Sequence, residues 1–122
     1  DAVFGEGYAG ETITAGQPVY IDSTDSSKLK RADANASAAA GAAVGIAVHG
    51  ASNNQPLKYI RSGSLNPGAT AAVGTIYVVS GTVGGIAPHG DLVTGWFTCT
   101  LGIGTTTSNI AVRVHAGGAA VP

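Results

Sequence analysis

Charged residues are scarce in this sequence. Asp, Glu, Lys and Arg make up 11% of its 122 residues, and seven acids against six bases leave a formal net charge of −1. Binding of DNA or RNA requires a basic face that displaces counterions from the phosphates, so nucleic acid is not an expected partner. So little charge also gives weak electrostatic protection against association, which favours a surface that a protein partner covers.

Cysteine and long apolar runs are scarce as well. Cys99 is the only cysteine, so no internal disulfide can form and cysteine pairing does not indicate a compartment. The longest apolar stretch, residues 36–48, is mostly Ala and Gly and is shorter than the roughly 18 residues that span a bilayer. No membrane segment is expected. The chain starts at Asp1 without a Met or a signal peptide, which leaves a removed leader open.

β-Branched residues and glycine are abundant. Val, Ile and Thr together contribute 32 residues, and 19 glycines interrupt them at short intervals, a composition typical of an all-β domain. A chain of this length has room for one domain. Since 21 of the hydrophobic residues are Ala, the core is expected to be thin and to gain stability from partner contacts.

Alternating apolar and polar residues mark the expected strands. In residues 17–22 and 44–49 an apolar side chain recurs at every second position, as in strands with one buried face. About seven short strands close naturally into a barrel or pack as a sandwich. The expected strands cover residues 17–22, 28–32, 44–49, 57–62, 75–80, 95–103 and 109–116.

One segment, residues 35–43 (NASAAAGAA), favours a helix. Its alanines have high helix propensity, Asn35 can cap its start, and Gly41 limits it to about two turns. An Ala-rich crossover loop fits the same residues. Turns are predicted where Asn-Pro-Gly suits a type II geometry and where Gly-Gly or His-Gly-Asp interrupts the pattern, at residues 66–68, 84–85 and 89–91.

Three histidines raise the question of a metal site. Three imidazoles with an open position can hold a catalytic zinc ion. However, His49, His89 and His115 stand on different expected segments, and none has a histidine partner at helical spacing. The acids of residues 22–33 lack the glycine and terminal Glu of a calcium loop. The sequence therefore predicts surface or loop histidines, with no metal and no cofactor.

Cys99 and Trp96 lie on opposite faces of one expected strand. A nucleophilic thiol needs an electropositive setting and a nearby base, but no charged residue lies between Trp96 and Ile110, so Cys99 is predicted to be a core residue. Trp96 is either an interface anchor or a residue packed under a loop. The core face is expected to carry Phe97, Cys99, Leu101 and Ile103, and the other face Trp96, Thr98 and Thr100.

Lys28, Lys30 and Arg31 form the only basic cluster, between Asp25 and Asp33. A solvated hairpin is the simplest interpretation. As a strand, Lys28 and Lys30 would share a face that could meet an acidic partner. The sequence contains no phosphate-binding Gly-Lys-Ser/Thr loop, no Gly-x-Ser-x-Gly elbow and no recognisable carboxylate pair, so no catalytic residue is assigned and no enzyme is expected.

The order of several short motifs resembles a known family, the small capsid decoration, or cement, proteins of tailed bacteriophages, of the lambda type. The likeness spans residues 11–118, and the order and spacing of the motifs carry it rather than any single one. The motifs are AGQPVY at residues 15–20, VGIA at 44–47, SG at 62–63, GTIYVVS at 74–80, GGIAP at 84–88, and LGIG at 101–104, followed by residues 109–114.

The resemblance implies a compact β-barrel or β-tulip that sits on the outside of the expanded capsid as a homotrimer and clamps adjacent major capsid subunits. It divides the chain into an extended N-terminal arm (residues 1–12), a single β domain (13–118) and a C-terminal tail (119–122). The expected capsid contacts are Val3, Phe4 and Tyr8 in the arm, with Lys28 and Lys30, while Trp96 is an expected oligomer or shell interface.

A second hypothesis is a non-enzymatic adhesion or glycan-binding module of a phage fibre. Trp96, the four tyrosines and the many threonines motivate it, because aromatic side chains are common at binding surfaces. Heads and glycans are different partners, and binding to one or the other discriminates between the two hypotheses.

Overall fold

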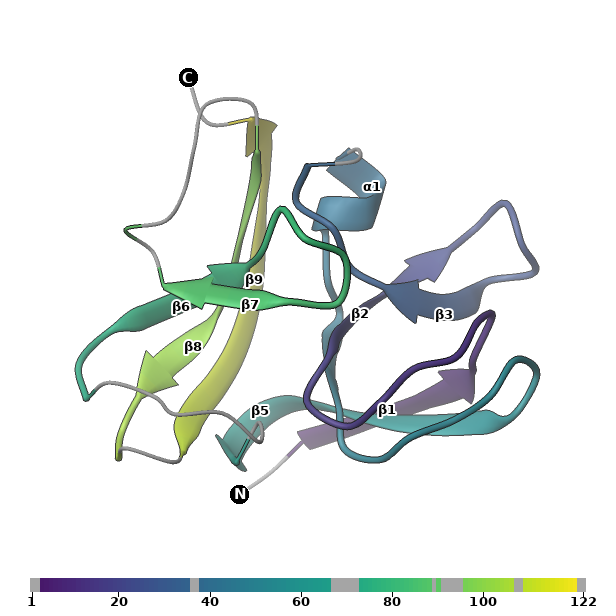
Figure 1. Cartoon of the computed structure of the whole chain (residues 1–122), viewed down its shortest axis with the longest axis horizontal. Helices are drawn as coiled ribbons and strands as arrows, with labels where there is room; N and C mark the ends of the chain where they lie inside the picture. The colour runs from purple at the N-terminus through teal and green to yellow at the C-terminus, as the bar shows by residue number, and fades with distance from the viewer. Residues whose placement is uncertain are drawn as a thin grey trace.

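The computed structural model describes residues 3–35, 38–66, 73–88, 90, 96–106 and 109–120. The predicted all-β class is confirmed, since the described chain is nearly all strand with one four-residue helix (Figure 1). The elements are β1 (Val3–Tyr8), β2 (Pro18–Asp22), β3 (Lys28–Arg31), α1 (Ala38–Gly41), β4 (Gly45–Ala47), β5 (Pro56–Leu65), β6 (Ile76–Val79), β7 (Ile86–Pro88), β8 (Phe97–Gly104) and β9 (Ile110–Ala120).

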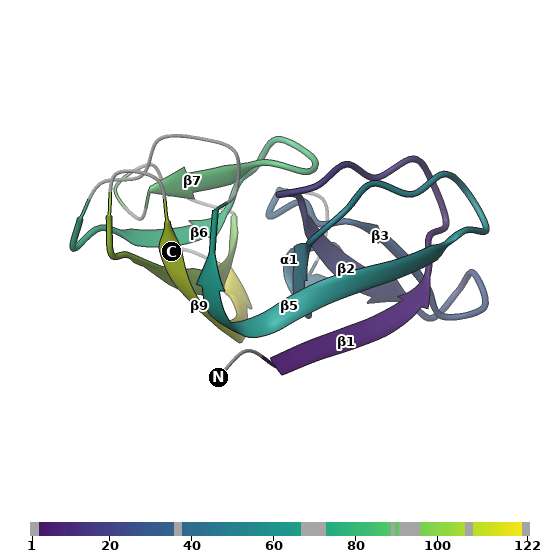
Figure 2. The same ribbon diagram turned by 90° about the horizontal axis from the view of Figure 1, so that it is seen from below.

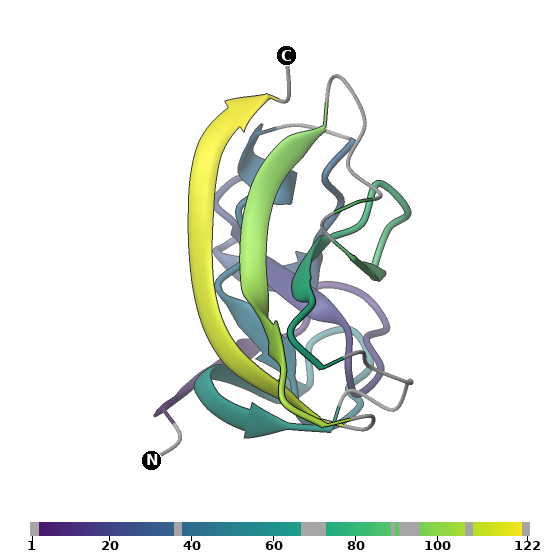
Figure 3. The same cartoon turned by 90° about the vertical axis from the view of Figure 1, so that its left-hand side faces the viewer.

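All seven expected strands are present, and β1 and β7 are additional. The strands form one antiparallel sheet in the order β3-β2-β4-β5-β9-β8-β6-β7, with β1 paired to β5 beside this path. The sheet curls strongly, so that β6 to β9 and β1 to β5 form two lobes (Figures 1 and 2). Seen from the side, β9 and β8 arch together along one lobe (Figure 3).

The first five strands close on themselves. Directly after β1, Ala9 forms a parallel bridge with Leu29 of β3, and the Gly10 amide donates to the Leu29 carbonyl at 2.7 Å. Since β1 also pairs with β5, each of these strands has a neighbour on both sides around a ring. The closed ring surrounds a buried cluster that contains Ala9, Ile13, Val19, Leu29, Ala47, Ala51, Leu57 and Tyr59.

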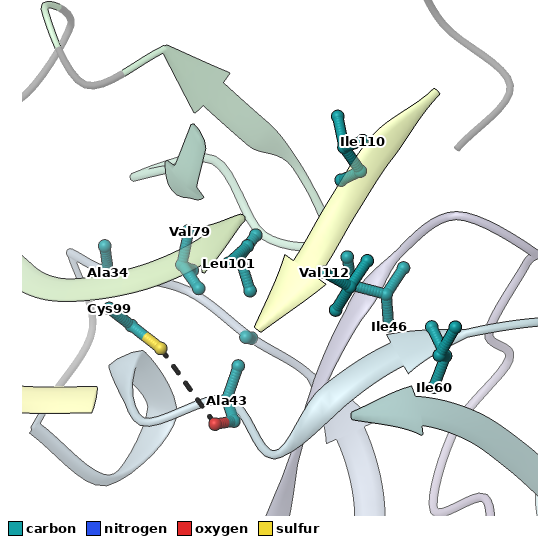
Figure 4. Close-up of a cluster of buried hydrophobic side chains, with 10 residues drawn as sticks. Ala34, Ala43, Ile46, Ile60, Val79, Cys99, Leu101, Ile110 and Val112 are labelled. Atoms are coloured by element: carbon teal, nitrogen blue, oxygen red, sulfur yellow. Dashed lines mark hydrogen bonds between the residues drawn. The ribbon is translucent and has the colours of Figure 1, made fainter. Parts of the chain in front are cut away.

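Strands β4 and β5 form a wall between this cluster and a second one. Ile46 of β4 is paired with Ile60 of β5, and both belong to the second cluster. The adjacent pair, Ala47 and Tyr59, belongs to the cluster inside the ring. Alternate residues of the same strands therefore face two cores, which explains why all of β4 is buried. The second cluster contains Ala32, Ala34, Ala43, Ile46, Ile60, Val79, Cys99, Leu101, Ile110 and Val112 (Figure 4).

The Ala-rich segment forms a single helical turn, α1, which is shorter than the two turns that the sequence allowed. The Asn35 amide donates to Asp33 Oδ1 at 2.9 Å. Gly41 ends the helix against β8, where a Cβ would lie 2.9 Å from Cβ of Phe97. The predicted turn at residues 84–85 is present, with the Gly85 amide donating to the Thr82 carbonyl at 3.0 Å. The predicted turns at 66–68 and 89–91 fall partly outside the described residues.

Both ends of the described chain belong to the sheet to a greater extent than the sequence indicated. The expected arm contains β1, which is extended as predicted. However, β1 pairs with β5 and does not project away from the β domain. Gly5 and Gly7 make this possible, because the side chains of Tyr59 and Leu29 occupy the space where their Cβ atoms would lie. At the other end β9 continues to Ala120 and so includes part of the expected tail.

Gly45 is the tightest point of the wall. A Cβ added there would lie 2.5 Å from Tyr59 Cδ2 and 2.6 Å from the Ile60 carbonyl oxygen. We predict that Gly45→Ala lowers the free energy of unfolding by about 1 to 3 kcal/mol, the usual cost of overpacking, in urea denaturation. Gly50→Ala is the control, since its nearest neighbour atom is 3.4 Å away, and its effect should stay within about 0.5 kcal/mol. Equal effects of the two substitutions would contradict the close packing at the wall.

Candidate functional site

The exposed apolar side chains of β1 form the first candidate contact surface. Val3, Phe4 and Tyr8 are 50%, 45% and 60% exposed, although each is large enough to stabilise a core. Phe4, Glu6 and Tyr8 alternate with the inward-facing glycines. The structure therefore places all three predicted arm contacts on one strand, at the outer side of β5 (Figure 2).

Charged groups border this apolar row. Lys58 of β5 lies directly opposite Glu6, and its ammonium group is 4.6 Å from the centroid of the Phe4 ring, within cation–π range. Beside them is a shallow hollow of about 380 Å³ that Glu6, Tyr8, His49, Pro56 and Lys58 help to line. The outer side of β1 and β5 thus presents aromatic rings together with one balanced pair of charges.

The basic cluster lies in the β2–β3 hairpin and is engaged within the chain. Lys30 Nζ is 2.9 Å from Asp22 Oδ2 and 3.2 Å from Asp25 Oδ2. Lys28 Nζ donates to Asn54 Oδ1 at 2.6 Å. Arg31 Nη2 is 3.3 Å from Glu11 Oε1. The face that the sequence assigned to Lys28 and Lys30 exists, but only Lys30 is paired with carboxylates, whereas Lys28 bonds to a neutral amide.

Among the carboxylates of these contacts, Asp22 has the pKa that departs most from its usual value. The Thr24 hydroxyl donates to Oδ1 at 2.6 Å, and the Thr24 amide donates to the same oxygen at 3.0 Å. These bonds, together with the one from Lys30, lower the pKa of Asp22 to about 2. In return, the hydrogen bonds to Asp22 and Asp25 raise the pKa of Lys30. The group is a local hairpin clamp and not an open cation site.

The histidines do not come together in the described structure. The Lys58 amide donates to His49 Nε2 at 3.1 Å, so the ring proton is assigned to Nδ1, which is 2.9 Å from the Gly50 carbonyl oxygen. His89 lies outside the described residues, and the side chain of His115 is not described. Among the described residues no group of three or more His, Cys, Asp and Glu could hold a metal ion.

Cys99 lies in the second cluster, and the prediction that it is a core residue is confirmed. Its side chain is fully buried and its Sγ is 3.9 Å from the Ala43 carbonyl oxygen (Figure 4). Burial raises the pKa of the thiol, which disfavours the reactive thiolate.

Trp96 is half-buried and packs against the same cluster. A Cβ at Gly81 would overlap its indole ring, so Gly81 provides the space that the ring occupies. Of the two interpretations that the sequence left open, this geometry favours a tryptophan packed under a neighbouring loop over an outward interface anchor.

Ile103 was expected in the core but is 41% exposed. The cause is a β-bulge in the β6–β8 pairing, where Tyr77 is opposite Gly102 but Val78 is opposite Thr100, so that Leu101 is the additional residue of β8. Beyond this irregularity the buried positions of β8 are Gly102 and Gly104, and Ile103 turns outward. There it pairs with Ile76 of β6, which is also exposed.

Two further features have no motif in the sequence. The Ile76–Ile103 pair borders a hollow of about 400 Å³ on the outside of the second lobe. A groove of about 410 Å³ lies where β1, β5 and β9 meet, and it contains two arginines that are 52 positions apart in the chain. Val3, Ala43, Val44, Arg61, Ser62, Arg113 and Val114 line it. Only strand pairing brings these residues together, so sequence spacing carried no signal for the groove.

No family model matches the chain, and a search of curated proteins finds no match for it. None of the helical structure among the described residues is long and apolar enough to cross a membrane.

The burial of Cys99 predicts a thiol that is inert in the folded protein. We expect alkylation by iodoacetamide at pH 8 to be at least 100-fold slower in buffer than in denaturant, because the reaction requires local opening of the second core. Mass spectrometry of quenched samples measures the rate. Rapid alkylation without unfolding would show that the thiol is accessible.

The hairpin clamp predicts a loss of stability in acid. Because the folded pKa of Asp22, about 2, is below its usual value of 3.8, the contribution of this carboxylate is complete above 3.8 and is lost as the pH falls towards 2. Carbon-13 NMR titration measures the pKa directly. In Thr24→Val, which removes the hydroxyl donor, we expect the pKa of Asp22 to rise towards 3.8; an unchanged value would show that Thr24 does not hold this carboxylate.

Proposed function

We propose that the protein is a structural virion protein that binds the outer surface of an expanded phage capsid. It stabilises the shell by clamping adjacent major capsid subunits, and it catalyses no reaction. The ordered motif series over residues 11–118 supports this proposal, as does the small all-β fold with its thin, alanine-containing cores.

The observation that carries the proposal is the row of exposed apolar side chains on β1. A row of large apolar side chains exposed on the outside of a sheet is a liability in a protein that stays alone in solution. Val3, Phe4 and Tyr8 are about half exposed in the isolated chain. Full burial of such a side chain contributes roughly 1.5 to 3 kcal/mol, and each of the three still lacks part of this contribution. Docking of β1 onto the shell would provide that burial.

A clamp requires contacts on more than one side. The exposed Ile76–Ile103 pair belongs to β6 and β8. These strands lie in the second lobe, whereas β1 lies in the first (Figure 1). In the proposed arrangement β1 binds the major capsid protein, and the isoleucine pair contacts a neighbouring copy within a homotrimer. Because several copies are held together, modest contacts add up to slow dissociation through multivalency.

The adhesion hypothesis has less support. It relied on an outward Trp96, and this ring is packed against the second cluster. Tyr59 is buried, and Tyr20 and Tyr77 are half-buried, which leaves Tyr8 as the most exposed tyrosine among the described residues. One exposed ring does not form a stacking platform for a sugar chain.

Cosedimentation with empty expanded heads tests the proposal. We predict saturable binding of the wild-type protein and a decrease of at least tenfold in affinity for the triple variant Val3→Ser, Phe4→Ser, Tyr8→Ser, because the apolar contact with the shell is lost. Ile21→Ser is the matched control, since Ile21 has the same 45% exposure as Phe4 but lies on β2.

The same heads provide a mechanical measurement. Decorated particles should survive heating or osmotic shock better than stripped particles, and the triple variant should not restore this resistance. Equal survival of decorated and stripped particles, or no binding of the wild-type protein, would reject the capsid proposal.

A further inference from the structure

Among the described residues, Arg61 and Arg113 are the basic residues whose side chains form no ion pair, hydrogen bond or ring contact. The other four basic residues are engaged: Lys30 and Arg31 form ion pairs, Lys28 bonds to Asn54, and Lys58 lies over the Phe4 ring. The side chains of Arg61 and Arg113 form no ion pair or hydrogen bond with any of the described residues. In a chain with so few charges, two adjacent uncompensated guanidinium groups are a distinct feature.

A β-bulge brings Arg61 onto the same face as Arg113. In the β1–β5 pairing, Val3 is opposite Ser62 and Phe4 is opposite Ile60, so Arg61 is the additional residue of β5. Bulges redirect side chains in this way and often occur beside binding sites. After the bulge, Ser62 pairs with Arg113 of β9, and the two arginines face the same groove.

The neighbouring residues are consistent with this change of face. Ile60 before the bulge is buried in the second cluster, whereas Arg61 is exposed and Ser62 is half-buried. Gly63 follows with a φ of 126°, a conformation that L side chains rarely adopt. A regular strand would have sent Arg61 and Ser62 to opposite faces. The bulge therefore places the Arg61 guanidinium group and the Ser62 hydroxyl group on the same face as Arg113 of the neighbouring strand.

The groove combines this positive charge with an apolar lining of Val3, Ala43, Val44 and Val114. Arginine binds planar carboxylates through paired hydrogen bonds, and apolar walls strengthen such contacts by excluding water. A nucleic acid would need a wider basic face than two residues in a chain of net charge −1. We propose that this groove binds an acidic segment of a partner protein, with Arg61 and Arg113 receiving its Asp or Glu carboxylates.

A second copy of the chain is a less suitable occupant. Four of its five described carboxylates are already in use: Asp22 and Asp25 contact Lys30, Glu11 contacts Arg31, and Asp33 accepts from the Asn35 amide. Only Glu6 is left, and one carboxylate does not match two arginines. The inference goes beyond capsid attachment and does not depend on it, because the groove lies outside the β1 row apart from Val3.

NMR titration of the full chain with a blocked peptide tests the proposal. The probe is acetyl-Thr-Glu-Val-Glu-Thr-amide, added to about 10 mM so that millimolar binding is detected. We expect shifts centred on the amides of Ser62, Arg113 and Val114 that weaken as the salt concentration rises. The peptide with Gln in place of Glu should bind at least tenfold more weakly.

Matched variants separate the groove from general charge. Arg61→Gln with Arg113→Gln should weaken peptide binding at least tenfold, whereas Lys58→Gln, which removes one charge from β5 outside the groove, should change it less than twofold. Arg61→Lys with Arg113→Lys should give an intermediate affinity, because charge remains but paired hydrogen bonds are lost. Amide spectra establish that each variant is folded.

Four results would overturn the inference: no shifts at these amides, equal binding of the Gln peptide, tighter binding of inorganic phosphate than of the Glu peptide, or self-association that the double Gln variant abolishes. The last two would identify a phosphate ligand or a second copy as the occupant. Binding to heads is measured separately with the β1 variants, so failure of one proposal leaves the other intact.

Discussion

The burial of β4 on both faces is the constraint on which the rest of the structure depends. A strand with a core on each side must have all its backbone groups paired and must carry side chains that fit both cores. β4 meets the first condition by pairing with β2 and β5. It meets the second with Gly45 and Ala47 beside a single large residue, Ile46. Because this wall serves two clusters, a chain rich in small residues can still form two closed interiors.

Two β-bulges determine which side chains reach the outer surface. One adds Arg61 to β5 in its pairing with β1, and the other adds Leu101 to β8 in its pairing with β6, just before Ile103. Each changes the face of the residues that follow, since side chains alternate along a strand. The exposed isoleucine pair and the two-arginine groove both arise from these changes. The surfaces proposed for partners are thus produced by departures from regular pairing.

The few charges are divided into two groups with different surroundings. In the β2–β3 hairpin, Lys30 is held between Asp22 and Asp25, and Arg31 pairs with Glu11. On the sheet, Arg61 and Arg113 have no described carboxylate to offset them. The charges of the hairpin contribute to local order, whereas the two arginines of the sheet are the groups that the proposed acidic partner would contact. The apolar row on β1 adds a second surface of different chemistry.

The sequence by itself determined the all-β class, the positions of seven strands and the core location of Cys99, because alternation and composition are local properties of a chain. It did not determine the strand β1, where two glycines hide the usual β-propensity, or the short β7. Only the tertiary structure decided that Ile103 faces outward and that Arg61 lies beside Arg113. A bulge is a mismatch between two strands, and it depends on a partner strand that is distant in sequence, so no pattern within one segment can reveal it.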